Sequence, residues 1–229
     1  SGGDVMGAVI RGKRTDTAID TITGVVMNSW GDSSVEYPQN IWFDGGWDNP
    51  QIDNPAIIRG LSQYAALMSA GPEDIQAYDW NEAGTAMQQN LAAFFLDASL
   101  FGPWFESDES PSQGNIGYTV IPPQSAGGQS YTAHWQWGIG MPANAANKDA
   151  AWYFMQYITN KQNEPIIGAK HGGAARMSTW DNPAYADTLN PEYVSTTLES
   201  MKTTRSSVVM KEGWAKYALE IDDVIQRIY

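Results

Sequence analysis

The sequence contains no cysteine, only two histidines and few basic residues. Without cysteine the chain forms no disulfide and offers neither a thiol nucleophile nor a zinc–thiolate site, although this does not fix its compartment. Its 13 Lys and Arg against 26 Asp and Glu leave a formal net charge of −13 at pH 7. A strongly negative chain repels phosphate backbones, so we expect no nucleic-acid partner.

Long hydrophobic runs are absent as well. Stretches such as Leu91–Leu96 fall far short of the ~20 apolar residues that cross a bilayer. With 42% apolar residues, however, a chain of 229 residues can bury a sizeable core. That length allows one large domain or two small ones. The sequence therefore predicts a folded protein without a membrane span.

Catalytic and metal-binding motifs are sparse. His134 and His171 are the two imidazoles, and neither lies in a Gly-x-Ser-x-Gly frame. Acid pairs such as Asp79 and Glu82 could in principle serve glycoside hydrolysis, but such acids are also typical of helix N-termini and solvated surface. The sequence has no Walker loop, no Gly-x-Gly-x-x-Gly motif and no EF-hand loop. We predict no catalytic residue, no metal site and no cofactor.

Aromatic residues are plentiful but unevenly distributed among types, with 10 Trp and 11 Tyr against 6 Phe. Trp and Tyr combine a flat apolar face with a polar edge, which suits a boundary between protein and water. Sugars and polyols present a matching surface, because their C–H faces stack on rings while their hydroxyls need hydrogen bonds. The alternative is that the large rings fill the core.

The apolar pattern predicts an α/β chain that is rich in helix and has few, scattered strands. Asn54-Pro55 and Asn190-Pro191 each place an Asn cap before a first-turn proline, which is typical of a helix start. We expect helices at about residues 17–28, 54–70, 79–95, 147–158, 164–168, 190–201 and 211–228. We expect strands at residues 5–10, 41–43, 116–121 and 135–141.

Four segments, in order along the chain, carry a family resemblance. They are residues 80–87 (Trp-Asn-Glu, then Gly-Thr-Ala-Met), 116–122 (Ile-Gly-Tyr-Thr-Val-Ile-Pro), 135–154 (Trp-Gln-Trp to Ala-Ala-Trp-Tyr-Phe) and 176–183 (Arg-Met-Ser to Asn-Pro). Together they resemble the extracellular solute-binding proteins of bacterial ABC importers, in the sugar and polyol group related to maltose- and mannitol-binding proteins. The resemblance covers about residues 5–229.

The resemblance implies a helix-rich α/β fold like that of type II periplasmic binding proteins. Family members usually carry well over a hundred further residues before the segment that corresponds to Val5–Arg11, so this chain is expected to represent mainly the C-terminal lobe. We assign residues 1–139 and 179–229 to that lobe and residues 140–178 to the N-terminal lobe. Apolar surface left by the missing lobe would then favour self-association.

The resemblance also implies a set of ligand-binding residues. Trp135 matches a family Trp that stacks on a sugar ring, and Trp137 is expected on the same strand face. The two glycines before that family Trp are Ala133 and His134 here. The full predicted set is Arg11, Trp30, Trp47, Asn90, Trp135, Trp137 and Arg176, with core packing, salt bridges or helix capping as the structural alternative for each.

The function implied is the substrate-binding component of an ABC importer, which binds a sugar or sugar alcohol in a cleft between two closing lobes. Its partners would be this ligand and the membrane permease subunits, and its location would be periplasmic or extracellular. A glycan-active enzyme or a carbohydrate-binding module is the alternative. A further alternative is that this chain alone retains no ligand binding.

Overall fold

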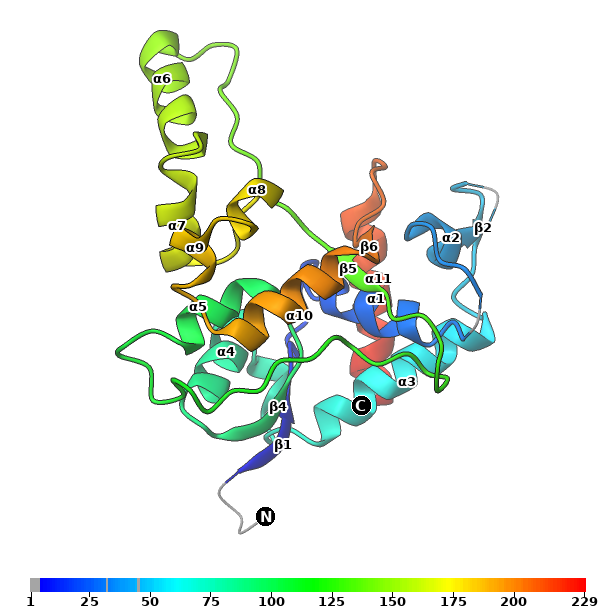
Figure 1. Ribbon diagram of the computed structural model, residues 1–229. Coiled ribbons are helices and arrows are strands. Elements are labelled where there is room, and N and C mark those ends of the chain that lie inside the picture. The colour runs from blue at the N-terminus through cyan, green and yellow to red at the C-terminus, as the bar shows by residue number, and fades with distance from the viewer. Residues whose placement is uncertain (1–4, 32, 45) are drawn as a thin grey trace. The chain divides into compact units, whose positions relative to one another are not determined.

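The computed structural model describes residues 5–31, 33–44 and 46–229. The chain divides into two compact units, many of whose helices and strands are labelled in Figure 1. Among the described residues, the first comprises 5–31, 33–44, 46–98, 119–135 and 199–229, and the second comprises 99–118 and 136–198. These boundaries differ from the expected ones at 139/140 and 178/179. The assignment of residues 140–178 to another lobe stays a prediction.

The first unit is built around three packed helices and a short parallel strand pair. Strand β1 (Met6–Val9) pairs with β4 (Ala92–Phe95) in parallel, with Met6 opposite Ala92 and Val9 opposite Phe95. Its other elements are α1 (Ile19–Asn28), α2 (Gln39–Trp42), β2 (Phe43–Asp44), β3 (Asn49–Pro50), α3 (Pro55–Ser69), a 3-10 turn (Ile75–Ala77), α4 (Trp80–Gln88), β5 (Thr132–His134), β6 (Thr204–Ser206) and α11 (Trp214–Ile228).

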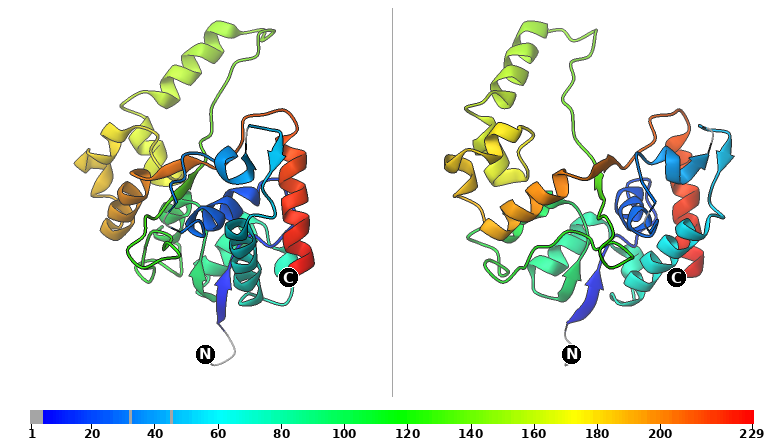
Figure 2. Two further views of the ribbon diagram at one scale, coloured as in Figure 1. Left: turned by 90° about the vertical axis from the view of Figure 1, so that its right-hand side faces the viewer. Right: turned by 45° about the vertical axis from the view of Figure 1, so that its right-hand side comes forward.

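Three helices of this unit enclose its core. Helices α1, α3 and α11 pack on one another, and both views of Figure 2 show α3 beside α11. Ile22 and Val26 of α1 are completely buried, as is Ile57 of α3. Helix α3 starts as the Asn-Pro signal predicts, because the side chain of Asn54 accepts a hydrogen bond from the Ala56 amide.

The second unit consists of short helices. They are a 3-10 turn (Ser99–Phe101), α5 (Gly102–Phe105), α6 (Lys148–Thr159), α7 (Glu164–His171), α8 (Met177–Trp180), α9 (Pro183–Ala186) and most of α10 (Pro191–Met201). Its interior is aromatic. Trp180 meets the ring of Tyr185 edge-on at 5.4 Å between centroids, and Tyr193 closely approaches Gly102, where even a Cβ atom would clash.

Most of the predicted helices are confirmed, but the helix expected to run to residue 95 is wrong. It ends at Gln88, and Asn90 then adopts a left-handed φ of 58°, a conformation that Asn tolerates better than most residues. This turn sends Ala92–Phe95 back as strand β4. A short apolar run fits either a buried helix or a strand, so periodicity alone could not separate them.

Three expected strands are wrong. Residues 116–121 form no ladder, because Tyr118 bonds instead to helix α10, whose Glu192 carboxylate accepts its amide hydrogen at 3.1 Å. Residues 135–141 are irregular, and the strand lies earlier, at Thr132–His134. Over residues 41–43, helix α2 occupies the first two positions and a two-residue strand starts at Phe43.

No helix in the described part of the chain is both long and apolar enough to cross a membrane.

The contact between α1 and α3 depends on Gly60. A Cβ atom at this position would lie 2.7 Å from the Cα atom of Val26. We expect Gly60→Ala to lower the free energy of unfolding by about 1–3 kcal/mol, because overpacking outweighs the gain in helix propensity. Urea unfolding followed by circular dichroism measures this. Gly140→Ala, which meets nothing within 4 Å, is the matched control, and equal stability of both variants would contradict the packing account.

Candidate ligand-binding site

The candidate site begins where strands β1 and β4 end. Because these strands are parallel, their carboxyl ends lie at the same edge of the sheet. Arg11 comes two residues after β1, and Asp97 comes two residues after β4. Val9 and Ile10 are fully buried, which fixes the backbone from which Arg11 projects. The topology therefore brings two opposite charges together.

Arg11 and Asp97 form a buried, bidentate ion pair. The guanidinium donates from Nε to Oδ2 and from Nη2 to Oδ1, both at 2.7 Å. The Asp97 side chain is completely buried, and that of Arg11 is 10% exposed. The remaining arm of the guanidinium donates to the carbonyl of Thr17 at 2.9 Å. This pairing is the salt-bridge alternative considered for Arg11, and it ties the loop before α1 to the sheet edge.

Asp20, in the first turn of α1, extends the cluster. Its Oδ1 atom accepts a hydrogen bond from the Ser207 hydroxyl at 2.7 Å, while Oδ2 lies 4.0 Å from Nη1 of Arg11. Burial raises the pKa of Asp20, because the charged form loses hydration, and the Ser207 hydrogen bond and Arg11 counteract this. Ser207 also donates its amide hydrogen to the His134 carbonyl at 3.0 Å, which fixes the end of β5 beside α1.

A cavity of about 180 Å³ opens beside this cluster, wholly within the first unit. It is lined by residues from the start of α1, from the ends of β5 and β6 and from the start of α11. The lining residues are Asp16, Thr17, Ile19, Asp20, Trp135, Val208, Trp214 and Ala215. Trp135 directly follows β5 and is 46% exposed, so its indole combines contact with the cavity and contact with water.

An aromatic cluster continues from Trp214. Its ring lies 5.8 Å from that of Tyr217 and 6.4 Å from that of Trp47, and Trp47 contacts Phe43 at 4.3 Å, all measured between centroids. Trp214 itself is buried. The predicted site residue Trp47 thus packs behind Trp214 and does not itself line the cavity. The cluster makes that wall stiff, because neighbouring rings restrict its movement.

Of the predicted site residues, the structure brings Arg11, Trp47 and Trp135 into this region. Trp30 is partly buried against the hydrophobic core after α1 and is not among the cavity residues. Asn90 forms the turn between α4 and β4, where its backbone N–H donates to the Met87 carbonyl at 3.0 Å. The residues predicted from the family resemblance therefore do not gather in a single site.

Trp137 and Arg176 belong to the second unit. The Trp137 side chain is 81% exposed. The premise that Trp135 and Trp137 share one strand face is wrong, because β5 ends at His134 and glycines follow at positions 138 and 140. Arg176 caps α8, and its guanidinium donates to the Thr159 carbonyl at 2.7 and 3.3 Å.

Sequence reasoning missed Asp97, Asp16, Asp20 and Trp214. An acid directly after the apolar run Leu91–Leu96 was the available signal for Asp97, but reading that run as helix concealed it. Trp214 falls within the helix predicted at residues 211–228, and the local apolar pattern explains its burial but not its place on a cavity wall. Only the fold brings the start of α11 beside the start of α1.

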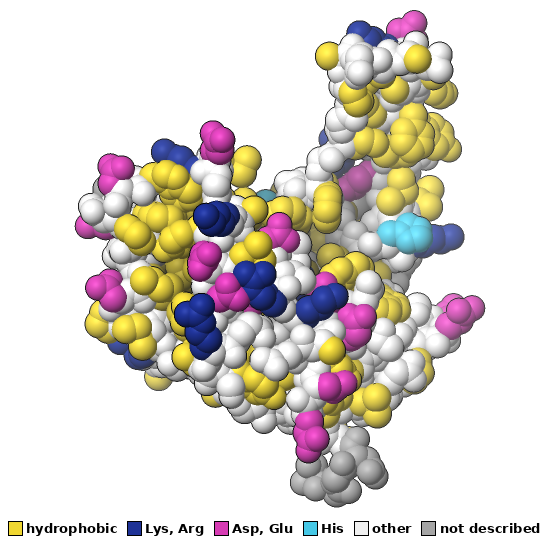
Figure 3. All heavy atoms as spheres, turned by 180° about the vertical axis from the view of Figure 1, so that it is seen from behind, with side chains coloured by type: hydrophobic (Ala, Val, Ile, Leu, Met, Phe, Trp, Pro, Cys, Tyr) yellow, Lys and Arg dark blue, Asp and Glu magenta, His cyan; other side chains and the backbone are white. Residues whose placement is uncertain are grey.

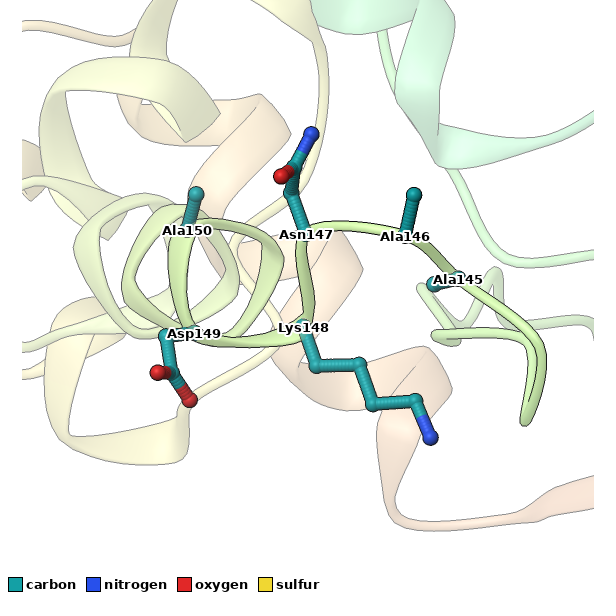
Figure 4. Close-up of a pocket in the computed structure, with 6 residues that line it drawn as sticks. All are labelled: Ala145, Ala146, Asn147, Lys148, Asp149 and Ala150. Carbon is teal, nitrogen blue, oxygen red and sulfur yellow. The ribbon is translucent and has the colours of Figure 1, made fainter.

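A larger hollow of about 560 Å³ lies before α6, but its composition does not suit a ligand. Six consecutive residues line it, from Ala145 to Ala150, and Figure 4 shows their side chains pointing in different directions. It has no aromatic wall. Across residues 5–31, 33–44 and 46–229, no group of three or more His, Asp or Glu is placed to hold a metal ion.

Comparison with known proteins identifies the family. The sequence profile of the bacterial extracellular solute-binding proteins matches residues 15–165, so the chain belongs to this family. The chain is 28% identical over 143 residues to an erythritol/L-threitol-binding protein of Mycolicibacterium smegmatis, covering 61% of this chain and 30% of that protein. It is 25% identical over 205 residues to a mannitol-binding protein of Pseudomonas aeruginosa, covering 86% of this chain and 44% of that protein.

Solved structures agree on the fold. An ABC transporter solute-binding protein of Agrobacterium vitis S4 with bound D-mannitol aligns with a TM-score of 0.76 at 21% identity, over 98% of this chain and 61% of that one. A solute-binding protein of Agrobacterium radiobacter K84 in complex with ribitol also gives 0.76, at 18% identity, over 99% of this chain and 56% of that one. The predicted type II binding-protein fold is confirmed. The relatives and fold neighbours are substrate-binding proteins and not enzymes, as predicted for the family. The chain spans less than half the length of the two curated relatives.

The Arg11–Asp97 pair predicts a large effect of a single substitution. Asp97→Ala leaves a guanidinium buried without its carboxylate, and we expect a loss of about 3–5 kcal/mol in the free energy of unfolding. Asp223→Ala is the matched control, because it breaks an equally bidentate pair with Arg14 that is exposed to solvent. Denaturant unfolding measures both. A loss no greater in Asp97→Ala than in the control would contradict the role of the buried pair.

Proposed function

We propose that this chain carries part of the ligand site of an ABC importer's substrate-binding component, which binds a neutral sugar or sugar alcohol outside the cytoplasmic membrane. The observation that carries the proposal is the half-exposed Trp135 on the wall of a cavity beside hydrogen-bonding groups. The hydrocarbon face of the ligand would stack on the indole, and its hydroxyls would bond to the polar groups around Asp20. Family membership and the polyol ligands named for the relatives support this assignment.

The roles of the polar residues follow from their partners. Asp20 keeps lone pairs that a ligand hydroxyl can use, because only Ser207 donates to it within 3.5 Å among the contacts of the described residues. Arg11 is bonded to Asp97 and Thr17, so we assign it to positioning the start of α1, which carries Asp20, as well as to ligand contact. Trp30, Trp47, Asn90, Trp137 and Arg176 stay predicted ligand residues.

In the family, a second lobe closes on the ligand, and we propose that residues 140–178 belong to it. The proposed partners are the sugar or polyol and the membrane permease subunits. The remainder of the second lobe would come from the part of the relatives that this chain does not span. Hinge closure would then bury the stacked ligand from both sides.

Loss of the stacking surface predicts loss of binding. We expect Trp135→Ala to weaken the binding of D-mannitol or erythritol by at least about tenfold, since an indole that anchors a ligand contributes more than about 1.4 kcal/mol. Isothermal titration calorimetry measures the affinity. Trp80→Ala is the control, because Trp80 is similarly exposed at 40% but does not line the cavity. Unchanged affinity in Trp135→Ala would refute the stacking role.

We also propose that the 229-residue chain self-associates through helix α6. No residue of α6 is buried, and Figure 3 shows hydrophobic side chains gathered over this helix. Trp152, Tyr153, Phe154 and Tyr157 are 55–71% exposed, which amounts to on the order of 500 Å² of aromatic surface. Together with Ile166 and Ile167 of α7, this approaches the roughly 800 Å² per partner of a stable interface. The segment 150–160 carries no charge, so two chains of net charge −13 can approach there.

Acidic residues introduced on the exposed face of α6 should prevent self-association. We expect the unsubstituted chain to form dimers as its concentration rises, and Tyr153→Asp with Phe154→Asp to be monomeric, because two carboxylates would be buried at the interface. Sedimentation velocity measures the mass. Tyr37→Asp is the control, because it places a charge on an exposed ring of the first unit. A monomeric unsubstituted chain would contradict the proposal.

A further inference from the structure

Two arginines that precede the acidic part of the cavity wall in the chain are already paired. Arg11 donates from Nε and Nη2 to Asp97 and from Nη1 to the Thr17 carbonyl. Arg14 lies two residues before Asp16 and is bonded to Asp223 through Nε at 2.5 Å and Nη2 at 2.8 Å. No Lys, Arg or His is among the residues that line the cavity. An anion in the cavity would therefore find no basic residue on its walls, and the charge of the nearby Arg11 is already balanced by Asp97.

Two acidic residues line the same cavity. Asp20 is partly buried and keeps one oxygen without a donor closer than Arg11 at 4.0 Å. Asp16 lies one turn earlier in the chain and is exposed. The other lining residues contribute no charge; they are Thr17, Ile19, Trp135, Val208, Trp214 and Ala215. Both carboxylates therefore repel an anionic ligand, and added salt screens the repulsion most strongly at the exposed Asp16.

The size of the cavity sets a second limit. The cavity of about 180 Å³ offers room for one short polyol or a single sugar ring. A longer ligand would have to extend out of it, past the half-exposed Trp135. The stiff aromatic layer behind Trp214 opposes expansion of the cavity.

From these observations we infer that the cavity selects short uncharged polyols and rejects sugar acids and sugar phosphates, with Asp16 and Asp20 as the residues that determine this selectivity. The inference rests on the proposed function, because it concerns the same site. It adds that discrimination comes from repulsion of the wrong ligands, which is a common route to specificity. The Trp135 ring contributes binding to charged and uncharged polyols alike, so it does not discriminate between them.

The test compares D-mannitol with D-mannonate and mannitol 1-phosphate, using the 229-residue chain. Ligand-observed NMR and calorimetry at low ionic strength measure binding down to millimolar affinity. We expect mannitol to bind at least about tenfold tighter than either anion, and added salt to reduce this ratio. We expect Asp16→Asn and Asp20→Asn each to lower the ratio several-fold. Glu73→Gln, which removes an exposed acid that does not line the cavity, should leave the ratio unchanged.

The outcomes separate this inference from the proposed function. Equal binding of mannitol and mannonate, or tighter binding of an anion, would overturn the inference and leave the proposed function standing. A ratio that falls as much in Glu73→Gln as in the two Asp variants would also overturn it, because the effect would then come from net charge. Absence of binding by all three compounds would overturn both the proposed function of this chain and the inference.

Discussion

The buried pair between Arg11 and Asp97 is the interaction on which the rest of the site depends. It joins the ends of two parallel strands and, through the Thr17 carbonyl, holds the loop that leads into α1. That loop carries Asp16 of the cavity wall and leads into the first turn of α1, which carries Asp20. Removing two charges from water is costly, and the bidentate geometry and the backbone acceptor offset this cost. Arg11, which the family resemblance predicts to contact the ligand, thus also has a structural role.

The cavity combines parts that lie far apart in the chain. Its polar side comes from residues 16–20, its exposed indole from position 135, and its rear wall from the start of α11. The Ser207 hydroxyl donates to Asp20. It thereby links residues 16–20 to the parallel pair of β5 and β6, which ends beside Trp135. Binding of a polyhydroxy ligand needs this combination of a flat apolar surface and fixed hydrogen-bonding groups.

Much of the helical fold could be predicted from sequence, because Asn-Pro caps and regular apolar spacing are local signals. The strands could not be predicted as well. Residues 92–95 are equally apolar in either conformation, and only pairing with β1 decides between them. Residues 116–121 have a strand-like composition, but their bonds go to α10. Similarly, Trp135 could be singled out from its neighbours in sequence, whereas the acids around it become part of a site only through long-range packing.

The central claim is that Trp135 stacks on a neutral polyhydroxy ligand within the first unit. A crystal structure of the chain grown with D-mannitol tests it most directly. The account predicts carbon atoms of the ligand within about 4 Å of the Trp135 ring, with a ligand hydroxyl bonded to the Asp20 carboxylate. Mannitol bound elsewhere, with the face of Trp135 covered by protein side chains, would contradict it.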